Sequence, residues 1–385
     1  MPPLNAIESG GLGVTLVSFL ILLLYYLRLY GRLVRKSETE ESARGEQPSI
    51  SILLYAHDDA ERLSRNLPLL LQQDYPRFQV IVIIDNPKND TEDILSAFRQ
   101  RHDNLYHTYI PAEARYLSRR KLAFTLGAKA AHYDTLLFTE TNCHPTSDRW
   151  LAEIAAAYRP QTQIVLGFCR YGDYPGLFQK LVAYDNLLEG ARCLSAALAH
   201  HPYAGDGRNL SYRKSLFFQQ KGYYRSLNLV AGDDDLFVNE SATAENTRIV
   251  RTTGSQTEME PIDQAAAWIG SKVTRVATKR HYKGRELWIF RMENAVFFLL
   301  QLSALGTIAA GCFGNWIVAA VAGAIYALRF LAKAIVFHRL GRTLGQRMGA
   351  GWLFPLEFIQ PLIEVYVRLL HHFRHEKDYT FTVES

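Results

Sequence analysis

Two long stretches without a charged side chain constrain this chain more than any other feature. The first covers residues 9–27 and the second covers residues 294–328. A helix needs about 20 apolar residues to cross the hydrocarbon core of a bilayer, so the first stretch predicts one membrane span. The second is interrupted near its middle by the sequence GCFGN at 311–315, which predicts two spans joined by a tight turn.

The basic residues beside these stretches predict their orientation. No Lys or Arg precedes the first stretch, whereas Arg28, Arg32, Arg35 and Lys36 follow it. Basic residues also flank both ends of the second stretch, and basic flanks favour the cytoplasmic side. We therefore expect a multi-pass protein of the inner (cytoplasmic) membrane with its central part in the cytoplasm. A cleaved signal peptide would need a positive charge before the apolar run and a small-residue cleavage site after it, and neither is present.

These features divide the chain into five predicted parts. They are an anchor with a basic flank (1–36), a polar linker (37–48), a cytoplasmic domain (49–285), a transmembrane hairpin (290–340) and a C-terminal part (341–385). The last part has an apolar run over 352–370 that contains Glu357, Glu364 and Arg368. That many charges favour a helix lying at the membrane interface or re-entering it over a further span.

The cytoplasmic part contains three consecutive carboxylates, Asp233, Asp234 and Asp235, between apolar residues on both sides. Like charges this close repel, and an unpaired buried carboxylate is costly. One interpretation is an acidic helix N-terminus, where Asp caps free amides. The other is a catalytic cluster in which one ionised Asp deprotonates a hydroxyl.

The start of this part predicts strand–helix–strand units and hence an α/β fold. Apolar runs at 49–55 and 78–84 flank a helical pattern, and continuous apolar strands are typical of a parallel sheet covered on both faces. Ligands bind such sheets at the carboxyl ends of the strands. Four side chains follow those ends and are candidate ligand contacts, although each could also serve a turn: His57, Asp58, Asp59 and Asp85.

A further apolar strand at 135–138 leads into Glu140-Thr141-Asn142. Two oxygen-bearing side chains two residues apart lie on one face of a strand and could hold a divalent cation and a phosphate. Lys121, in the basic run 119–121, could neutralise a diphosphate, or it could be a solvated lysine.

Charge and cysteine content exclude other classes of protein. The formal net charge is +5, and the excess lies beside the apolar segments, so no nucleic-acid partner is expected. The four cysteines have no paired spacing, which argues against a zinc site or a disulfide framework.

Several motifs in the same order resemble a membrane-anchored family 2 glycosyltransferase of the GT-A type. The resemblance covers about residues 50–282, and ordered motifs are more specific than any single one. It rests on the sequences QDYP at 73–76, TETNCHP at 139–145 with WL at 150–151, GRNLSYR at 207–213 and GDD at 232–234.

The resemblance implies a GT-A domain, with a Rossmann-like nucleotide-binding fold and flanking transmembrane helices, and roles for individual residues. Asp234 is implied as the catalytic base, with Asp233 and Asp235 positioning it. The donor, a nucleotide-diphosphate sugar with a UDP-sugar favoured, would contact these residues: Ala56, His57, Asp58, Asp59, Asp85, Lys121 and Glu140. The acceptor would lie near Asn209, Tyr212 and Arg213.

Two departures from the family pattern weaken parts of this assignment. The family's Asp-x-Asp is Glu140-Thr141-Asn142 here, so Glu140 and Asn142 would hold Mg or Mn with less charge than two acids. The family's Gln-x-x-Arg-Trp segment matches poorly near residue 271, where only Lys272 and Arg275, with Trp268 nearby, are comparable on the acceptor side.

We therefore expect transfer of a sugar, with inversion, to a hydroxyl of a glycan or a lipid-linked acceptor. The alternative is a catalytically inactive membrane subunit that keeps the fold and pairs with an active partner. The altered 140–142 motif favours that alternative, and the intact acidic triplet argues against it.

Overall fold

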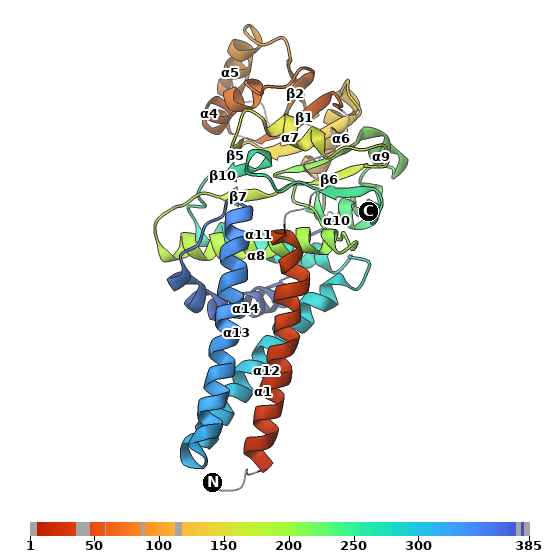
Figure 1. Ribbon diagram of the computed structural model, residues 1–385. Helices are drawn as coiled ribbons and strands as arrows, with labels where there is room; N and C mark the ends of the chain where they lie inside the picture. The colour runs from red at the N-terminus through yellow and green to blue at the C-terminus, as the bar shows by residue number, and fades with distance from the viewer. Residues whose placement is uncertain are drawn as a thin grey trace.

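The computed structural model describes residues 6–35, 47–57, 59–85, 89–111, 118–374 and 379–380. A head built on two β-sheets stands on a layer of transverse helices, and long helices extend from that layer as a stalk (Figure 1). Asp58 and nearly all of the predicted linker lie outside the described residues.

The main sheet has seven strands in the order β3-β2-β1-β4-β8-β6-β9. Its first four strands run parallel: β3 (Leu105–Tyr109), β2 (Phe78–Asp85), β1 (Ile50–His57) and β4 (Thr135–Glu140). Strand β8 (Leu210–Arg213) is antiparallel to both of its neighbours, β4 and β6 (Ile164–Leu166), and β9 (Thr247–Ile249) runs parallel to β6. The predicted α/β class with a largely parallel sheet is confirmed.

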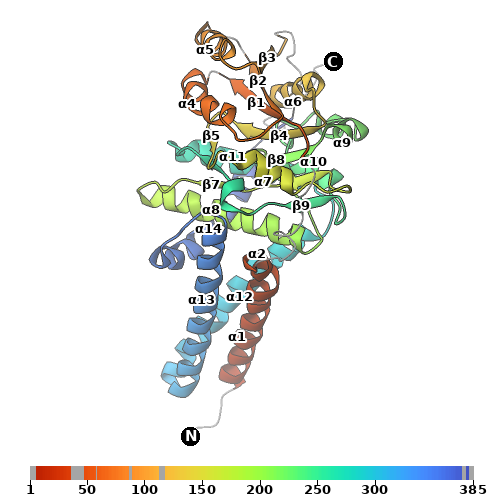
Figure 2. The same cartoon turned by 45° about the horizontal axis from the view of Figure 1, so that its top comes forward.

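Helices cover both faces of this sheet, as the continuous apolar strands predict (Figure 2). Side chains alternate along β1, so Ile52 and Leu54 join one core and Leu53 joins the other. The first core includes side chains from α4 (Ala60–Leu71), α5 (Asn89–Arg99) and α7 (Trp150–Ala156), and the second includes α6 (Arg119–Ala130).

A second, three-stranded sheet extends the edge where β4 ends. Its order is β5-β10-β7, with β10 (Thr257–Met259) between β5 (Cys143–Pro145) and β7 (Cys169–Tyr171). The remaining short helices of the head are α9 (Lys214–Gln219), α10 (Asp235–Ser241) and two 3-10 turns at Tyr224–Ser226 and Thr253–Ser255. The small sheet fixes the chain that follows Glu140, so it shapes the site described below.

The transverse layer consists of α8 (Leu177–Leu198), α11 (Ala265–Lys279) and α14 (Ala350–Phe373). Helix α14 packs against α8, α11 and α13, and it runs across the stalk rather than along it (Figure 1). It contains the apolar run for which an interfacial helix is predicted, and it is not among the described helices that are apolar enough to span a membrane.

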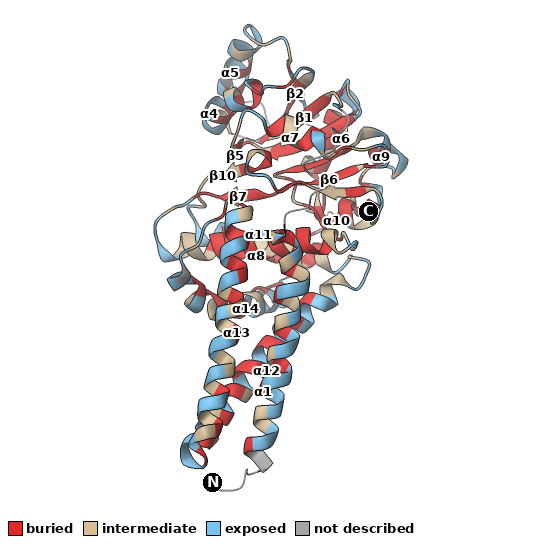
Figure 3. Cartoon of the chain, in the orientation of Figure 1, coloured by how far each residue is buried: buried red, intermediate tan, exposed pale blue. Residues whose placement is uncertain are grey.

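Three described helices are long and apolar enough to cross a membrane: Glu8–Val34, Glu286–Phe313 and Trp316–Thr343. The first comprises α1 (Ala6–Leu24), a π-helical stretch (Tyr25–Tyr30) and α2 (Gly31–Val34), and the others are α12 and α13. Their outer faces expose apolar side chains, including Leu302, which is 73% exposed, as lipid-facing helices would (Figure 3). The Glu8 carboxylate accepts the backbone N–H of Asn315 at the turn between α12 and α13.

Buried charges join the stalk to the transverse layer. The fully buried Glu357 carboxylate on α14 accepts a hydrogen bond of 2.8 Å from Arg329, and Lys333 lies 3.1 Å from its other oxygen. Both cations belong to α13. One carboxylate therefore pairs with two cations that have left water.

Substituting Glu357 by Ala should lower the free energy of unfolding by about 3–5 kcal/mol, because two buried cations would lose their counter-charge. Thermal unfolding of the full-length protein in detergent measures the effect. Asp173→Ala breaks the exposed pair with Lys180 and is the matched control, with an expected change below about 1 kcal/mol. Equal losses in the two variants would contradict the prediction.

Candidate active site

The acidic triplet lies at the N-terminus of α10, so the capping interpretation describes its local geometry. Gly232 has a φ of +99°, which an L side chain rarely adopts, and it turns the chain into the triplet. Asp234 is the N-cap, and its Oδ1 accepts the Asp235 N–H at 2.7 Å. This turn brings the three carboxylates into contact with α6, α11 and the loop before β8, and each carboxylate has different hydrogen-bond partners.

Two of the three carboxylates are held firmly. Asp233 accepts a 2.7 Å hydrogen bond from Nε of Arg120 and is 6% exposed. Asp235, 4% exposed, accepts hydrogen bonds of 2.7 Å from the hydroxyls of Thr278 and Tyr282. Neither has the freedom to take a proton from a substrate.

Asp234 is the least enclosed member of the triplet, with 17% of its side chain exposed. Its Oδ2 accepts the backbone N–H of Gly207 at 2.9 Å, and a nitrogen of Arg275 lies 3.9 Å away. A Cβ at position 207 would lie 3.2 Å from the Asp234 Cβ, so glycine permits this close approach. Asp234 is therefore the most exposed carboxylate of the three, and it lies next to Arg275 and Asp235, which line the cavity described below.

Burial raises the pKa of Asp234, and the neighbouring charge of Asp233 raises it further, while Arg275 acts in the opposite direction. A carboxylate with a raised pKa binds a proton more strongly than an exposed one. This property suits a general base at neutral pH.

The carboxyl ends of β1 and β2 bring several of the predicted donor contacts together. His57 and Asp85 are register partners, and the His57 Nδ1 lies 3.3 Å from an Asp85 oxygen. Burial would raise the pKa of Asp85, but hydrogen bonds from Arg119 and Tyr55 hold it below its ordinary value. A ligand that contacts Asp85 must therefore share or replace these bonds. Ala56 is buried in β1, so its side chain offers no contact.

Arg120 links the end of β4 to the acidic triplet. One of its terminal nitrogens lies 2.8 Å from a Glu140 oxygen, while its Nε binds Asp233. Asp59, on the far side of the same edge, accepts a hydrogen bond of 2.7 Å from the Thr141 hydroxyl. The Glu140-Thr141-Asn142 segment is thus held from both sides, with Glu140 and Asn142 facing the same cavity.

The structure corrects the role expected of Lys121. Its ammonium group is fully buried and donates to the backbone carbonyls of Ser226, Leu229 and Ala231. Burial lowers the pKa of Lys121 to about 8, against the raising effect of the nearby acidic triplet. Lys121 therefore holds the chain that leads into the triplet, and Arg120 is the basic side chain beside Glu140.

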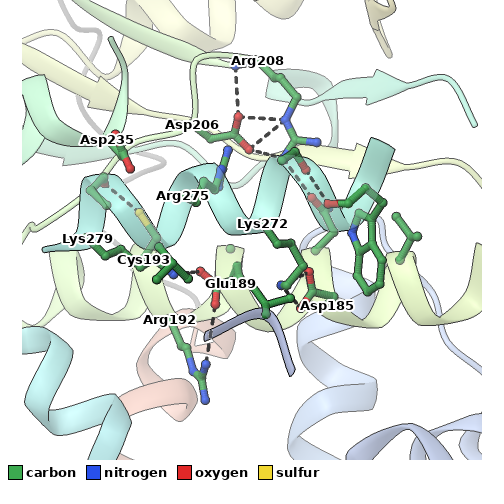
Figure 4. Close-up of a pocket in the computed structure, with 18 of the residues that line it drawn as sticks. Asp185, Glu189, Arg192, Cys193, Asp206, Arg208, Asp235, Lys272, Arg275 and Lys279 are labelled. Carbon is green, nitrogen blue, oxygen red and sulfur yellow. Dashed lines mark hydrogen bonds and ion pairs between the residues drawn. The ribbon is translucent and has the colours of Figure 1, made fainter. Parts of the chain in front are cut away.

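A cavity of about 810 Å³ connects this edge to the transverse helices. It is lined by Glu140, Asn142 and Asp235, and by side chains of α8 and α11, several of which Figure 4 labels. Three of the residues expected on the acceptor side line it, namely Trp268, Lys272 and Arg275. The Lys272 ammonium is paired with Asp185 at 2.6 Å, whereas Arg275 reaches toward Asp234.

The other three residues expected near the acceptor do not line the cavity. Asn209 is 1% exposed and binds the Trp150 indole and two backbone carbonyls. Tyr212 is buried against Phe138, and its hydroxyl contacts that of Tyr223. Arg213 donates to Thr135 at the opposite end of β4. We therefore assign Asn209, Tyr212 and Arg213 to the framework of the fold.

The donor set fits a divalent cation only if a substrate supplies further ligands. No group of three His, Cys, Asp or Glu side chains suitable for a metal exists among the described residues. Glu140 and Asn142 nonetheless offer two hard oxygens to one cavity, and Mg²⁺ is commonly bound by one or two protein carboxylates together with substrate phosphates.

Sequence reasoning missed three further residues of this site: Arg120, Arg208 and Asp206. Arg120 and Lys121 belong to the same basic run, 119–121, which indicates a contact with negative charge. The sequence alone does not show which of the two side chains faces the site. Arg208 and Asp206 form a half-buried ion pair, and both line the cavity together with Arg275. Arg208 lies within the GRNLSYR motif and Asp206 directly precedes it.

Comparisons with known proteins agree with this arrangement. Residues 51–222 match the family described as Glycosyl transferase family 2. A mannosyltransferase from Pyrobaculum calidifontis, solved with GDP-Man and Mn²⁺, superposes with a TM-score of 0.57 at 17% identity, covering 91% of this chain and 98% of its own. S. aureus TarS 1–349 with UDP-GlcNAc gives a TM-score of 0.41 at 12% identity, covering 85% and 93%. No curated protein matches the sequence.

The family match spans the predicted donor edge, and the structural match to the mannosyltransferase covers nearly the whole chain with the same fold. Residues 51–222 therefore belong to a family 2 glycosyltransferase domain with the GT-A fold, in a chain whose flanking helices are long and apolar enough to span a membrane.

Proposed function

We propose that the protein transfers a sugar from a nucleoside diphosphate sugar to a hydroxyl acceptor at the cytoplasmic face of the membrane, with inversion. The observation that carries this proposal is the partly exposed carboxylate of Asp234, whose neighbours Arg275 and Asp235 line a cavity together with Glu140 and Asn142. The proposed general base thus lies next to the cavity that would hold the leaving diphosphate.

The reaction we propose is a direct displacement. Asp234 takes the proton of the acceptor hydroxyl, the hydroxyl oxygen forms a bond to the anomeric carbon, and the bond from that carbon to the diphosphate breaks. Asp233 and Asp235 keep their hydrogen bonds throughout and fix the orientation of the turn. Arg275, the nearest cation to Asp234, tunes its proton affinity.

The donor would lie along the carboxyl edge of β2, β1 and β4. His57, Asp59 and Asp85 would lie beside the nucleoside, and Glu140, Asn142 and Arg120 beside the diphosphate. The P. calidifontis enzyme was solved with GDP-Man, whereas the sequence of this protein favours a UDP-sugar. The nucleobase of the donor is therefore determined by the donor panel described below.

Mg²⁺ or Mn²⁺ would be held by Glu140 and Asn142 together with the diphosphate. A bound cation supplies positive charge that stabilises the departing diphosphate. Arg120 contributes a fixed positive charge at the same place, because its guanidinium already contacts Glu140.

The membrane topology proposed from the sequence fits this chemistry. With the basic flanks on the cytoplasmic side, the head would face the nucleotide sugars of the cytoplasm, and α14 would lie along the interface. The alternative of an inactive subunit has no support in the geometry, because the triplet, the cavity and the oxygen ligands are all in place.

Asp234→Asn should reduce transfer by about 10²–10⁴-fold, because the amide cannot accept the proton. Binding of the donor should remain within about twofold, since Asp234 does not lie at the donor edge. Nucleoside diphosphate release from GDP-, UDP- and dTDP-sugars, with membrane lipid extract as acceptor source, measures turnover, and calorimetry measures donor binding. Full turnover by this variant would remove Asp234 from the role of base.

The pH dependence of turnover should follow the protonation of Asp234. Activity requires the ionised carboxylate, so it should fall as the pH drops through a pKa that lies above the ordinary Asp value of 3.8. Arg275 lowers this pKa, so Arg275→Met should move the acid limb of kcat to higher pH. Arg225→Met, at a 3-10 turn away from the cavity, is the control and should leave the limb in place. A limb that stays unchanged in Arg275→Met would contradict the assignment.

Asn142→Asp should tighten the metal site, because a second carboxylate adds negative charge to the same pair of ligands. The Mg²⁺ or Mn²⁺ concentration for half-maximal turnover should fall by about tenfold, a change of about 1.4 kcal/mol. Titration of a chelated enzyme with each metal measures it. An Asn142→Asp enzyme with an unchanged metal requirement would show that this side chain does not ligate the cation.

A further inference from the structure

The first turn of α4 contains an arginine, Arg62, that lines the cavity and has no role in the reaction described above. It is connected to the Glu140-Thr141-Asn142 segment through Asp59, the N-cap residue of α4. One Asp59 oxygen accepts a hydrogen bond of 2.7 Å from the Thr141 hydroxyl, and the other accepts one of 3.3 Å from Nη1 of Arg62. Arg62 is therefore held beside the segment that would bind the donor diphosphate.

A second connection runs through Glu260, the residue that follows β10. Its backbone N–H donates to the Asn142 carbonyl at 3.0 Å, and one oxygen of its side chain lies 3.3 Å from Nε of Arg62. Glu140, Asn142 and Arg62 all line the same cavity. The second connection places Arg62 at the Asn142 end of the segment, whereas Arg120 contacts Glu140.

The Arg62 guanidinium has donor groups left for a ligand. Its side chain is 44% exposed, and both of its contacts, at 3.3 Å, are longer than the roughly 2.7–2.9 Å of a strong charge-assisted hydrogen bond. Its Nη2 has no hydrogen bond or ion pair with any residue that the structure describes. Glu260 is also shared with Arg65, which lies closer to it at 2.8 Å. Arg62 is thus only weakly engaged by its protein partners.

We propose that Arg62 binds the β-phosphate of the nucleotide-sugar donor, the phosphate to which the sugar is attached. This inference rests on the proposed function and adds a residue to its donor site. Guanidinium groups form strong, charge-assisted hydrogen bonds to phosphate oxygens.

The lining of the cavity selects the β-phosphate over the rest of the donor. Three residues proposed to lie beside the nucleoside do not line this cavity, namely His57, Asp59 and Asp85. Arg62 does line it, together with the residues proposed to lie beside the diphosphate. Arg62 therefore belongs to the end of the donor site where the bond to the sugar breaks.

The chemistry of the displacement gives a charge at this position a function. When the bond from the anomeric carbon to the diphosphate breaks, its electron pair stays on the oxygen of the β-phosphate. The β-phosphate consequently gains a negative charge as the sugar departs. A hydrogen-bond donor with a positive charge stabilises that developing charge more than it stabilises the bound donor.

The test compares two single variants of the full-length protein, Arg62→Gln and Arg65→Gln. The two arginines lie three residues apart on α4, are 44% and 56% exposed, and both pair with Glu260. Each variant loses one positive charge, and only Arg62 lines the cavity. An indirect effect through Glu260 would therefore appear in both variants.

Calorimetry at a fixed excess of Mg²⁺ measures the binding of UDP, UMP, GDP and GMP to each protein in detergent. With the base that the wild type binds, Arg62→Gln should bind the diphosphate about tenfold more weakly and the monophosphate within about twofold of wild type. Arg65→Gln should bind both within about twofold. Unchanged diphosphate affinity in Arg62→Gln, an equal loss of both nucleotides, or an equal loss in the two variants would each overturn the inference.

A third variant, Arg62→Lys, keeps the positive charge and provides a test if Arg62→Gln does not fold. It should bind the diphosphate more tightly than Arg62→Gln and more weakly than the wild type, because an ammonium is a point charge without the guanidinium fork. A Lys variant that prefers the diphosphate over the monophosphate no more than Arg62→Gln does, or as much as the wild type does, would overturn the contact.

The wild-type measurements separate the two levels of the argument. A wild type that binds neither UDP nor GDP would remove the proposed function and this inference with it. A wild type that binds a nucleoside diphosphate and turns over its sugar, with Arg62→Gln equal to it in both respects, would leave the proposed function standing and remove only the role of Arg62.

Discussion

The burial of three consecutive carboxylates is the constraint on which the rest of this structure depends. Three like charges on adjacent residues can leave water only if each receives its own partner. Arg120 of α6 serves Asp233, the backbone of Gly207 and Asp235 serves Asp234, and Thr278 with Tyr282 serves Asp235. These partners come from the parallel half of the sheet, the loop before β8 and the transverse layer. The active site is therefore the point at which the parts of the molecule are joined.

The three basic residues at the start of α6 show what sequence reasoning could and could not reach. The run 119–121 was visible as a group that could meet negative charge. Successive helical residues point about 100° apart, so Arg119 reaches Asp85, Arg120 reaches Glu140 and Asp233, and Lys121 turns inward to three carbonyls. Which residue faces the ligand depends on where the helix lies against the sheet, and that position is set by packing that the sequence does not display.

Features that depend on local sequence patterns were predicted correctly, whereas features that depend on non-local packing were not. The parallel strands, the α/β class and the spans follow from local patterns of apolar residues, and the structure agrees with them. The GRNLSYR segment has polar side chains too, but β8 pairs with both β4 and β6, so its alternate residues face two cores. Asn209 and Tyr212 are consequently buried. A polar residue in a motif contacts a ligand only if its strand has an open face, and non-local pairing decides that. The pairing of Val230 with Tyr379 near the C-terminus is equally invisible in sequence.

The ion pairs of the transverse layer explain why the cavity can extend to the first turns of α12 without collapsing. A space lined by apolar helices alone would tend to close, because closing removes apolar surface from water. Here, the charged pairs Lys272–Asp185 and Lys279–Glu189 link α8 to α11, and breaking the first pair would leave a largely buried charge. Helix α14 is fixed in turn through Glu357 to α13 and through Glu364 to Arg192. These ion pairs fix the head to the stalk, so the cavity keeps its position relative to the first turns of α12.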